Sequence, residues 1–402
     1  ALPILTQASD VIGQTGEDDS ASEMAIATCG SGSPVVDRPL RVATSVSPIT
    51  SLVGILAAGT KIQITGIIPE GTNSHTFEPP PSAAQTIAEA DLVIVNGLGL
   101  EENLLQLAAA NKKDSAIVCE AGTAALPKSE WAYDDSFPES AGKPNPHAWT
   151  NPTLVLRYVN SIRDALTVMD PSSMAKVDDN YVKLSTLIND LSDAMTTATE
   201  TVPARSRQLL TYHDSFPYFA RKFKYEIIGA IQPQSFSDPS AQDVAAIISQ
   251  VKESGVPAIF GSEVFPSPVL EQIGKETGVK YVDSLRDDDL PGKPGSAEHS
   301  WAGLLKQDFI TIVTNLGGDA AALKALNGIL LFRRTKAEPE VARELPDKID
   351  ELDHCTMTKE QIGLYQAVLD ELVAAVDHPD GAEAEEPKQG AILAAITALK
   401  QI

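Results

Sequence analysis

The chain has 402 residues, of which 43% are hydrophobic, enough for two or three domains with sizeable cores. Its 55 acidic and 31 basic side chains leave a formal net charge of −24. This charge argues against a nucleic-acid-binding surface and against adhesion to anionic lipid, whereas an acidic exterior suits the collection of cations. No run approaches the roughly 18 to 20 apolar residues that a membrane-spanning helix needs.

Residues 1–37 are predicted to form a flexible leader. Within it, Ile26-Ala-Thr-Cys29 resembles a lipoprotein cleavage site followed by a Gly-Ser tether, which would make Cys29 a lipid anchor. The preceding residues are acidic where a signal peptide needs a basic segment and an apolar stretch, so an unmodified Cys29 is the alternative. The three cysteines, which include Cys355, offer no disulfide framework, and Cys119 is expected to be a small core residue.

Residues 38–150 are predicted to form a lobe of alternating strands and helices with a mainly parallel sheet. Strands are predicted near residues 40–46, 61–68, 91–96 and 115–119. Helices are predicted near residues 48–58, 82–90 and 101–111. The fold class is therefore α/β.

A linking segment at residues 151–204 is predicted to be almost continuous helix, interrupted at Asp170-Pro171. A second lobe of the same kind is predicted at residues 205–318. Its predicted elements are strands near residues 208–212, 225–231, 256–261 and 279–283, and a closing helix near 298–316. Residues 319–402 are expected to form a helical tail.

Three of the six histidines lie in proline-framed turns about seventy residues apart, and an aspartate follows at the same interval. These candidate metal ligands are His75, His147, His213 and Asp283. All but His147 follow the carboxyl ends of predicted strands, which is the rim where open α/β sheets bind ligands. Three imidazoles and one carboxylate can close a tetrahedral shell around a divalent transition metal.

Other residues compete for these roles. Glu263 is the alternative fourth ligand, and Asp283 could instead cap the turn after its strand. Glu78 and Asp214 are predicted to orient the neighbouring imidazoles, because a ligating histidine usually donates its other ring N–H to a carboxylate or carbonyl. The remaining histidines are left without a role: His299, His354 and His378.

From about residue 38 to 318, the chain resembles the zinc/manganese solute-binding proteins that feed ABC transporters. Six motifs occur in the family's order, at residues 69–82, 90–101, 145–152, 213–219, 255–263 and 282–285. The resemblance implies two lobes joined by a long rigid helix, with small closing movements. The metal would lie between the lobes, held by His75 and His147 from the first and by His213 and Asp283 from the second.

The resemblance also implies a function. It implies a monomeric, non-enzymatic protein at the periplasmic or extracellular face of the cell membrane, which binds the metal and delivers it to an ABC permease. Three imidazoles with one carboxylate favour zinc, whereas manganese would more often meet a second carboxylate. Residues 121–146 lack the histidine-rich loop that many zinc-specific relatives carry at this position.

The stretch from about residue 328 to 402 resembles a short internal part of Swi/Snf-type helicase-like ATPases. No Gly-x-x-x-x-Gly-Lys-Ser/Thr loop occurs in the chain, so nucleotide binding of that kind is not expected. The tail is predicted to be a fused remnant or an interaction segment.

Two alternative functions stay open. A zinc hydrolase would need an open coordination position for water and a general base such as Glu263. The chain contains no Gly-x-Ser-x-Gly or His-Glu-x-x-His motif. The second alternative is an adhesin or scaffold protein that uses the tail.

Overall fold

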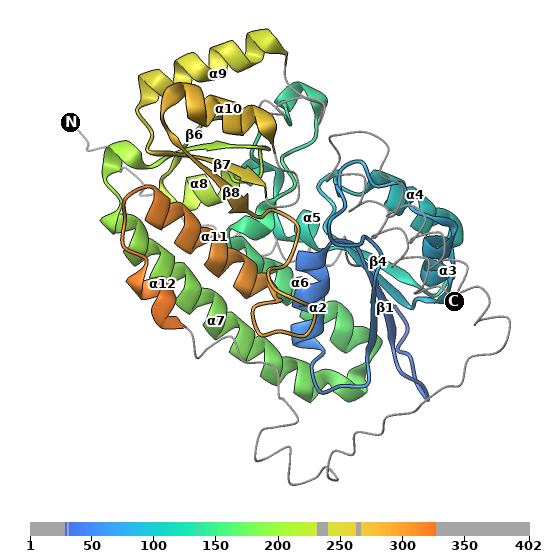
Figure 1. The fold of residues 1–402 in the computed structure, drawn as a ribbon. Helices are drawn as coiled ribbons and strands as arrows, with labels where there is room; N and C mark the ends of the chain where they lie inside the picture. Colours follow the sequence, from blue (N-terminus) through green and yellow to red (C-terminus); the bar gives the residue numbers. More distant parts are fainter. Residues whose placement is uncertain (1–28, 30–31, 135, 231–239, 263–266, 327–402) are drawn as a thin grey trace, which may run out of the picture. The chain divides into compact units, whose positions relative to one another are not determined.

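The computed structural model describes residues 29, 32–134, 136–230, 240–262 and 267–326, all within one compact unit that spans Ala1–Arg334. These residues form two α/β lobes, each built on a parallel sheet, with long helices between them (Figure 1). The predicted fold class is confirmed. The predicted helical extension beyond residue 326 lies outside the described residues.

The first lobe has the strand order β2-β1-β3-β4. The strands are β1 Arg41–Thr44, β2 Gln63–Gly66, β3 Leu92–Val95 and β4 Ile117–Glu120. The helices are α2 Ser47–Leu56, α3 Pro81–Glu89, α4 Glu102–Asn111 and α5 Ala121–Ala125. Each element predicted for this lobe is present near its predicted position. β3 is buried along its whole length, which explains its uninterrupted apolar run.

The linking segment consists of α6 (Pro152–Met169) and α7 (Met174–Thr201). They are separated at Asp170, whose carboxylate accepts hydrogen bonds from Ser172 N and from the hydroxyls of Ser172 and Ser173. The break lies at the predicted Asp170-Pro171 step. α7 packs against α2 of the first lobe and α11 of the second, so it connects both cores. No helix in the described part of the chain has the length and apolar composition needed to cross a bilayer.

The second lobe repeats the strand order of the first, as β6-β5-β7-β8. Its strands are β5 Gln208–Thr211, β6 Glu226–Ala230, β7 Ala258–Ser262 and β8 Lys280–Leu285. Its helices are α8 Pro217–Phe223, α9 Ala241–Ser254, α10 Pro268–Thr277, α11 Trp301–Asn315 and α12 Ala321–Ala325. The 3-10 turns of the two lobes and the linker are η1 Lys128–Glu130, η2 Glu139–Ala141, η3 Ala148–Thr150, η4 Pro171–Ser173 and η5 Ala204–Ser206.

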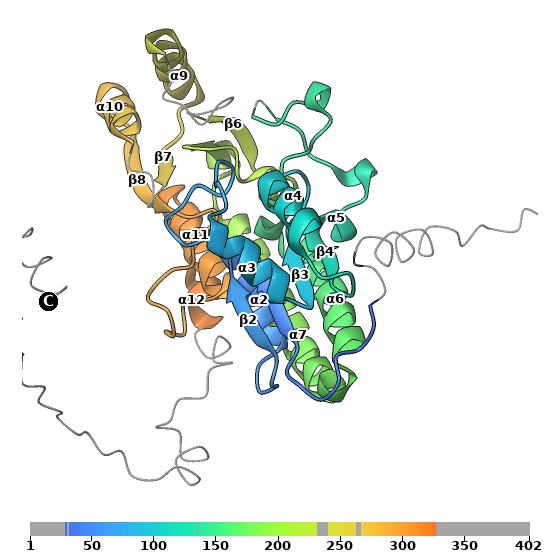
Figure 2. The ribbon, with the colours of Figure 1, turned by 90° about the vertical axis from the view of Figure 1, so that its right-hand side faces the viewer.

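Alternate strand residues face two different cores, as the strand period of two requires. On β5, Leu209 packs in the large core that contains Phe309 of α11. Leu210 belongs to a smaller core with Val251 of α9. Figure 2 shows α9 and α10 on the side of this sheet away from α11. The large core also includes Leu323 of α12, so the packed structure continues past the predicted lobe boundary at residue 318.

Cys29 and Cys119 form a disulfide across a sequence separation of 90. This corrects the expectation that the cysteines offer no disulfide framework, because nothing in so long a separation indicates the pairing. Cys119 is fully buried in the large core. A lipid thioether at Cys29 would use the same sulfur atom as the disulfide. Lipid attachment and the disulfide therefore exclude each other.

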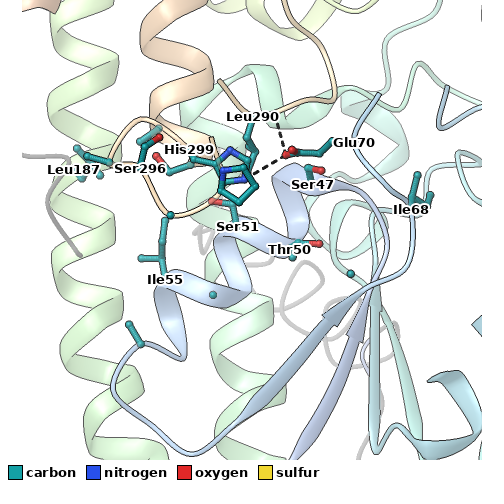
Figure 3. A pocket seen from close by; sticks show the side chains of 18 residues that line it. Ser47, Thr50, Ser51, Ile55, Ile68, Glu70, Leu187, Leu290, Ser296 and His299 are labelled. Atoms are coloured by element: carbon teal, nitrogen blue, oxygen red, sulfur yellow. Dashed lines mark hydrogen bonds and ion pairs between the residues drawn. The ribbon is translucent and has the colours of Figure 1, made fainter. Parts of the chain in front are cut away.

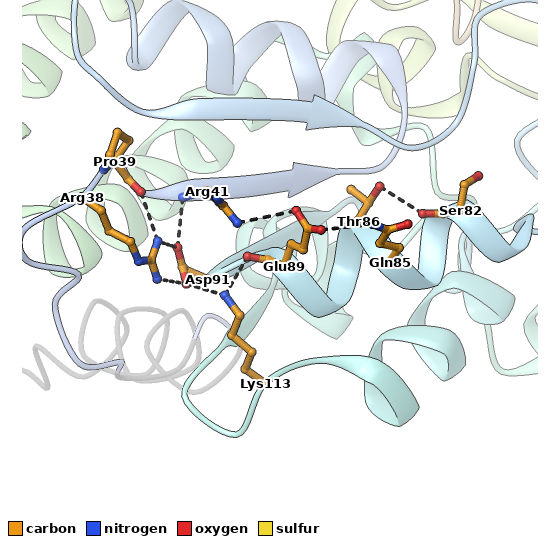
Figure 4. Close-up of polar contacts among 9 residues, drawn as sticks. All are labelled: Arg38, Pro39, Arg41, Ser82, Gln85, Thr86, Glu89, Asp91 and Lys113. Atoms are coloured by element: carbon orange, nitrogen blue, oxygen red, sulfur yellow. Dashed lines mark hydrogen bonds and ion pairs between the residues drawn. The ribbon is translucent and has the colours of Figure 1, made fainter.

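Asp91, at the entrance to β3, joins three segments of the first lobe (Figure 4). Its carboxylate accepts hydrogen bonds from both terminal nitrogens of Arg38 at 2.7 Å, from Arg41 N at 3.1 Å and from Lys113 Nζ at 3.0 Å. Burial alone would raise the pKa of Asp91, but these donors lower it overall to about 2. The carboxylate thereby connects β1, β3 and the segment before β4.

We expect Asp91→Asn to lower the free energy of unfolding at pH 7 by about 1–2 kcal/mol. The pKa of Asp91 is depressed in the folded chain, so its contribution is present above about pH 4 and is lost as the pH falls toward 2. Urea unfolding of parent and variant should therefore diverge at neutral pH and converge in acid. Asp179→Asn, which removes an exposed helical ion pair with Lys183, should change stability much less.

A second prediction concerns the disulfide. Proteolysis of the full chain under non-reducing conditions should release a cross-linked pair of peptides that contain Cys29 and Cys119, and reduction should separate them. Cys119→Ser should abolish the cross-link and expose a free thiol at Cys29. A thioether-linked lipid on Cys29 in the isolated protein would contradict the disulfide.

Candidate metal centre

Three imidazoles from distant parts of the chain meet between the two lobes. His75 lies in the loop after β2, His147 directly precedes η3, and His213 follows β5. Nε2 of His75 lies 3.2 Å from Nε2 of His147 and 3.1 Å from Nε2 of His213. The three candidate ligand atoms all lie within 4.8 Å of one another. The structure therefore brings the three predicted histidines together.

The spacing of these nitrogens suits a small divalent ion. Zinc–nitrogen bonds of about 2.0–2.1 Å place two ligands of a tetrahedral site about 3.3 Å apart. The observed Nε2 distances of 3.1 and 3.2 Å are close to this value. An ion could be bound among the three rings with little movement of the chain.

Asn145 holds the most deeply buried of the three rings. Its Oδ1 accepts from His147 N at 3.0 Å and lies 2.9 Å from His147 Nδ1. When Nδ1 of His147 carries the proton, its N–H donates to Asn145 Oδ1. The lone pair of Nε2 then faces the other imidazoles. Asn145 Nδ2 also donates to Asp214 O in the second lobe at 2.6 Å. One amide thus orients a ligand and links the lobes.

Local turns position the other two histidines. Asn73 Oδ1 accepts from His75 N at 2.9 Å, which closes an Asx-type turn immediately before the ring. The backbone carbonyl of His213 accepts from Thr211 Oγ1 at 2.8 Å and from Ser215 N at 2.9 Å. Each ring is therefore attached to a short, hydrogen-bonded turn at the carboxyl end of a strand.

The surroundings keep the imidazoles neutral. The Phe137 ring covers them, with its centroid 5.6 Å from His75 and 6.1 Å from both His147 and His213. Burial, followed by the neighbouring rings, lowers the pKa of His75 and His147 well below the usual range. Burial lowers the pKa of His213 to about 4, although the charge of Asp287 acts in the opposite direction. Neutral imidazoles are the form that binds a metal.

Asp283, the predicted fourth ligand, is not brought to the imidazoles. In β8, Val282 and Leu285 are buried, whereas the Asp283 side chain is exposed and does not belong to the group of converging ligand atoms. The predicted strand ended at residue 283, but β8 continues to Leu285. Asp283 is therefore a strand residue on the outer surface rather than the first residue beyond the strand's end.

Asp287, beyond the end of β8, is an acidic residue near His213, although its carboxylate, like that of Asp283, is outside the group of converging ligand atoms. Ser215 Oγ donates to its Oδ2 at 3.0 Å, and its charge acts on the neighbouring His213. Trp149 Nε1 donates to its backbone carbonyl at 2.9 Å. Asp287 was not predicted from the sequence, although the run Asp287-Asp288-Asp289 shortly after a strand was a usable signal.

The structure also gives contacts for three other residues that were singled out in the sequence: Glu78, Asp214 and His299. Glu78 Oε1 accepts from Asn103 Nδ2 at 3.1 Å on the surface. Asp214 Oδ2 accepts from the backbone nitrogen and the hydroxyl of Ser136. His299 lies 3.5 Å from Glu70. Three further residues of the sequence analysis lie outside the described part of the chain: Glu263, His354 and His378.

A parallel-sheet lobe on each side of a long helix, with three imidazoles converging between the lobes, is an arrangement that suits a two-lobed protein that binds a metal ion. Residues 42–315 match the family described as zinc-uptake complex component A, periplasmic, and the chain belongs to this family. The match ends before residue 328, so the resemblance of the tail to Swi/Snf-type ATPases stays a prediction.

Several characterised relatives cover most of the two lobes. The manganese-binding lipoprotein MntA of Halalkalibacterium halodurans is 27% identical over 278 residues, which is 69% of this chain and 88% of the relative. The iron-binding protein YfeA of Yersinia pestis is 25% identical over 280 residues, which is 70% of this chain and 87% of the relative. Their names refer to different metals.

Solved structures share the fold. The periplasmic zinc-binding protein TroA of Treponema pallidum has a TM-score of 0.63 at 23% identity and covers 69% of this chain and 99% of its own. The manganese-bound periplasmic metal-binding protein of Candidatus Liberibacter asiaticus has a TM-score of 0.60 at 26% identity, with the same coverage.

Membership of this family determines the general activity. The protein is the metal-binding component of an ABC transporter on the extracytoplasmic side of the membrane, and its partners are a divalent metal ion and a permease. The family consists of transporter components and not of enzymes, so the zinc hydrolase alternative is wrong.

Proposed function

We propose that this protein captures zinc with His75, His147, His213 and Asp287 and delivers it to its permease. The approach of three neutral Nε2 atoms, 3.1 to 3.2 Å apart around His75, is the observation that supports the proposal most directly. Asp287 would supply the charge of the fourth ligand, since it already acts on His213. Four protein ligands would close the shell without water, as suits binding rather than catalysis.

The donor set supports zinc over manganese. Imidazole nitrogen is a good ligand for zinc, whereas manganese favours carboxylate, carbonyl and water oxygens. Manganese is the alternative metal, and it is named for MntA, as iron is for YfeA. Only one carboxylate, that of Asp287, is proposed here beside three rings.

Delivery would follow from the division of the ligands between the lobes. His75 and His147 belong to the first lobe, and His213 and Asp287 to the second, so a small separation of the lobes would open the shell. α7 packs against both cores, which supports a short movement rather than a wide hinge. We infer that the protein acts as a monomer. A lipid at Cys29 is an alternative form that lacks the disulfide.

We expect one zinc ion per chain, and we expect His75→Ala, His147→Ala and His213→Ala each to weaken binding by at least about a hundredfold. Removal of one ligand from a closed shell forces water or a neighbour to replace it. Competition against a zinc chelator measures the affinity, and inductively coupled plasma mass spectrometry counts the metal. The matched control is His378→Ala, which removes a histidine with no proposed role and should bind like the parent. Parent-like affinity in all three ligand variants would contradict the site.

The fourth ligand is tested by a pair of aspartates on the same segment. Asp287→Ala should weaken zinc binding roughly ten- to a hundredfold, because the shell loses its only anionic ligand. Asp283→Ala should change affinity by less than about twofold, since its side chain is exposed on β8. Cobalt(II) substitution gives a second measurement, because its visible spectrum changes when a ligand is replaced by water. The reverse order of effects would assign the fourth position to Asp283.

A further inference from the structure

The segment that follows Asp287 meets the loop that leads to His75. Ser74 Oγ donates to Asp288 Oδ2. Gly71 N donates to both carboxylate oxygens of Asp289, at 3.0 and 2.9 Å. Leu290 N donates to Glu70 Oε1 at 3.4 Å. We call residues 70–74 and 288–290, with these hydrogen bonds, the clasp.

The clasp runs antiparallel, and this direction places two candidate ligands at the same end. Residue 70 pairs with 290, 71 with 289 and 74 with 288. The next residue in one segment is His75, and the preceding residue in the other is Asp287. The paired residues are 214 to 220 positions apart in sequence and belong to different lobes. The clasp therefore determines how closely these two ligands approach.

The central contact joins a buried carboxylate, that of Asp289, to the amide of the exposed residue Gly71, and the neighbouring Ser74 is buried. Asp289 is 7% exposed and Ser74 is 3% exposed. Gly71 has a φ of +77°, a left-handed conformation that glycine adopts without steric cost, and its N–H is directed at the Asp289 carboxylate. Removal of the Asp289 carboxylate takes away a charge-assisted acceptor that joins the two segments, so the contact between them is weakened.

Leu290 of the clasp packs in the large core, but the clasp is not packed on all sides. A cavity of about 540 Å³ lies beside it, lined by Glu70 and Leu290 together with residues of α2 such as Ser51 and Ile55 (Figure 3). In this view Glu70 receives the contacts from Leu290 N and from His299, whose Nε2 lies 3.5 Å from Glu70 Oε1. The polar contacts of the clasp therefore act together with the packing of Leu290 to hold the two segments together.

We propose that Asp289, supported by Asp288, is a positioning residue that clasps the His75 loop to the Asp287 segment and thereby slows release of the bound metal. This inference rests on the proposed metal site. The two carboxylates are engaged by Gly71 and Ser74, so they act through the ligand loops and not by coordination. Parting of the lobes for delivery requires the clasp to open.

The test uses the full chain loaded with zinc. Asp289→Ala should raise the zinc dissociation rate roughly tenfold, measured by stopped flow against excess chelator, while the association rate changes little. Asp289→Asn keeps an acceptor oxygen for Gly71 N, so it should restore most of the slow release. Ser74→Ala, a milder change, should raise the rate by a smaller factor and provides a second variant if Asp289→Ala does not fold.

Asp170→Ala is the matched control. Asp170 is 8% exposed and accepts several hydrogen bonds at the turn between α6 and α7, remote from the metal ligands. It should lower thermal stability without a change in zinc dissociation. Equal dissociation rates in parent, Asp289→Ala and Ser74→Ala would overturn the clasp, and so would equal acceleration by Asp170→Ala. A parent chain that binds no zinc would instead refute the metal site, so the two failures are distinguishable.

Discussion

The close approach of three imidazole nitrogens is the constraint on which the rest of the structure depends. The Nε2 atom of His75 lies 3.2 Å from that of His147 and 3.1 Å from that of His213. Burial lowers the pKa of these rings and keeps them neutral, and each ring needs contacts that fix its orientation. Asn145 orients His147, a turn at Asn73 positions His75, and the Phe137 ring excludes solvent. These contacts orient the three histidines that are proposed to bind the metal ion.

The repeated strand order of the two lobes explains why the ligands meet. In both sheets the carboxyl ends of the parallel strands lie at one edge, and the loops after β2, β5 and β8 extend from those edges. A metal bound there would contact residues of both lobes, which share one continuous large core. In the proposed function, release of the metal requires a small separation of the lobes.

Contacts outside the three-histidine cluster hold the segments on each side of the site in fixed positions. Asp91 joins three segments of the first lobe, and the disulfide connects Cys29 to the end of β4. Between the lobes, Trp149 donates to the backbone of Asp287, and the clasp adds part-buried polar contacts beside it. Because these contacts join the ligand loops to rigid frames, small displacements at the interface act directly on the metal ligands.

The local sequence pattern was sufficient to predict many of the strands and helices of this protein. The apolar run of β3, the helix break at Asp170 and the proline-framed histidines each carry their signal within a few residues, because strand and helix periodicity are local properties. The family resemblance led to the expectation that three histidines meet between two lobes, and the structure brings these histidines together. The helices α8, α9 and α10 were not predicted individually from the sequence.

Tertiary structure decided the rest. Whether Asp283 or Asp287 faces the rings depends on where β8 stops pairing with β7, and a strand that continues to Leu285 moves the exit from the sheet beyond Asp283. The disulfide and the clasp join residues 90 to 220 positions apart, and no local pattern specifies which of many polar or sulfur groups will meet at such separations. The sequence by itself determined the three candidate histidines and the two-lobed frame, whereas only the folded chain showed which acidic residue lies near His213.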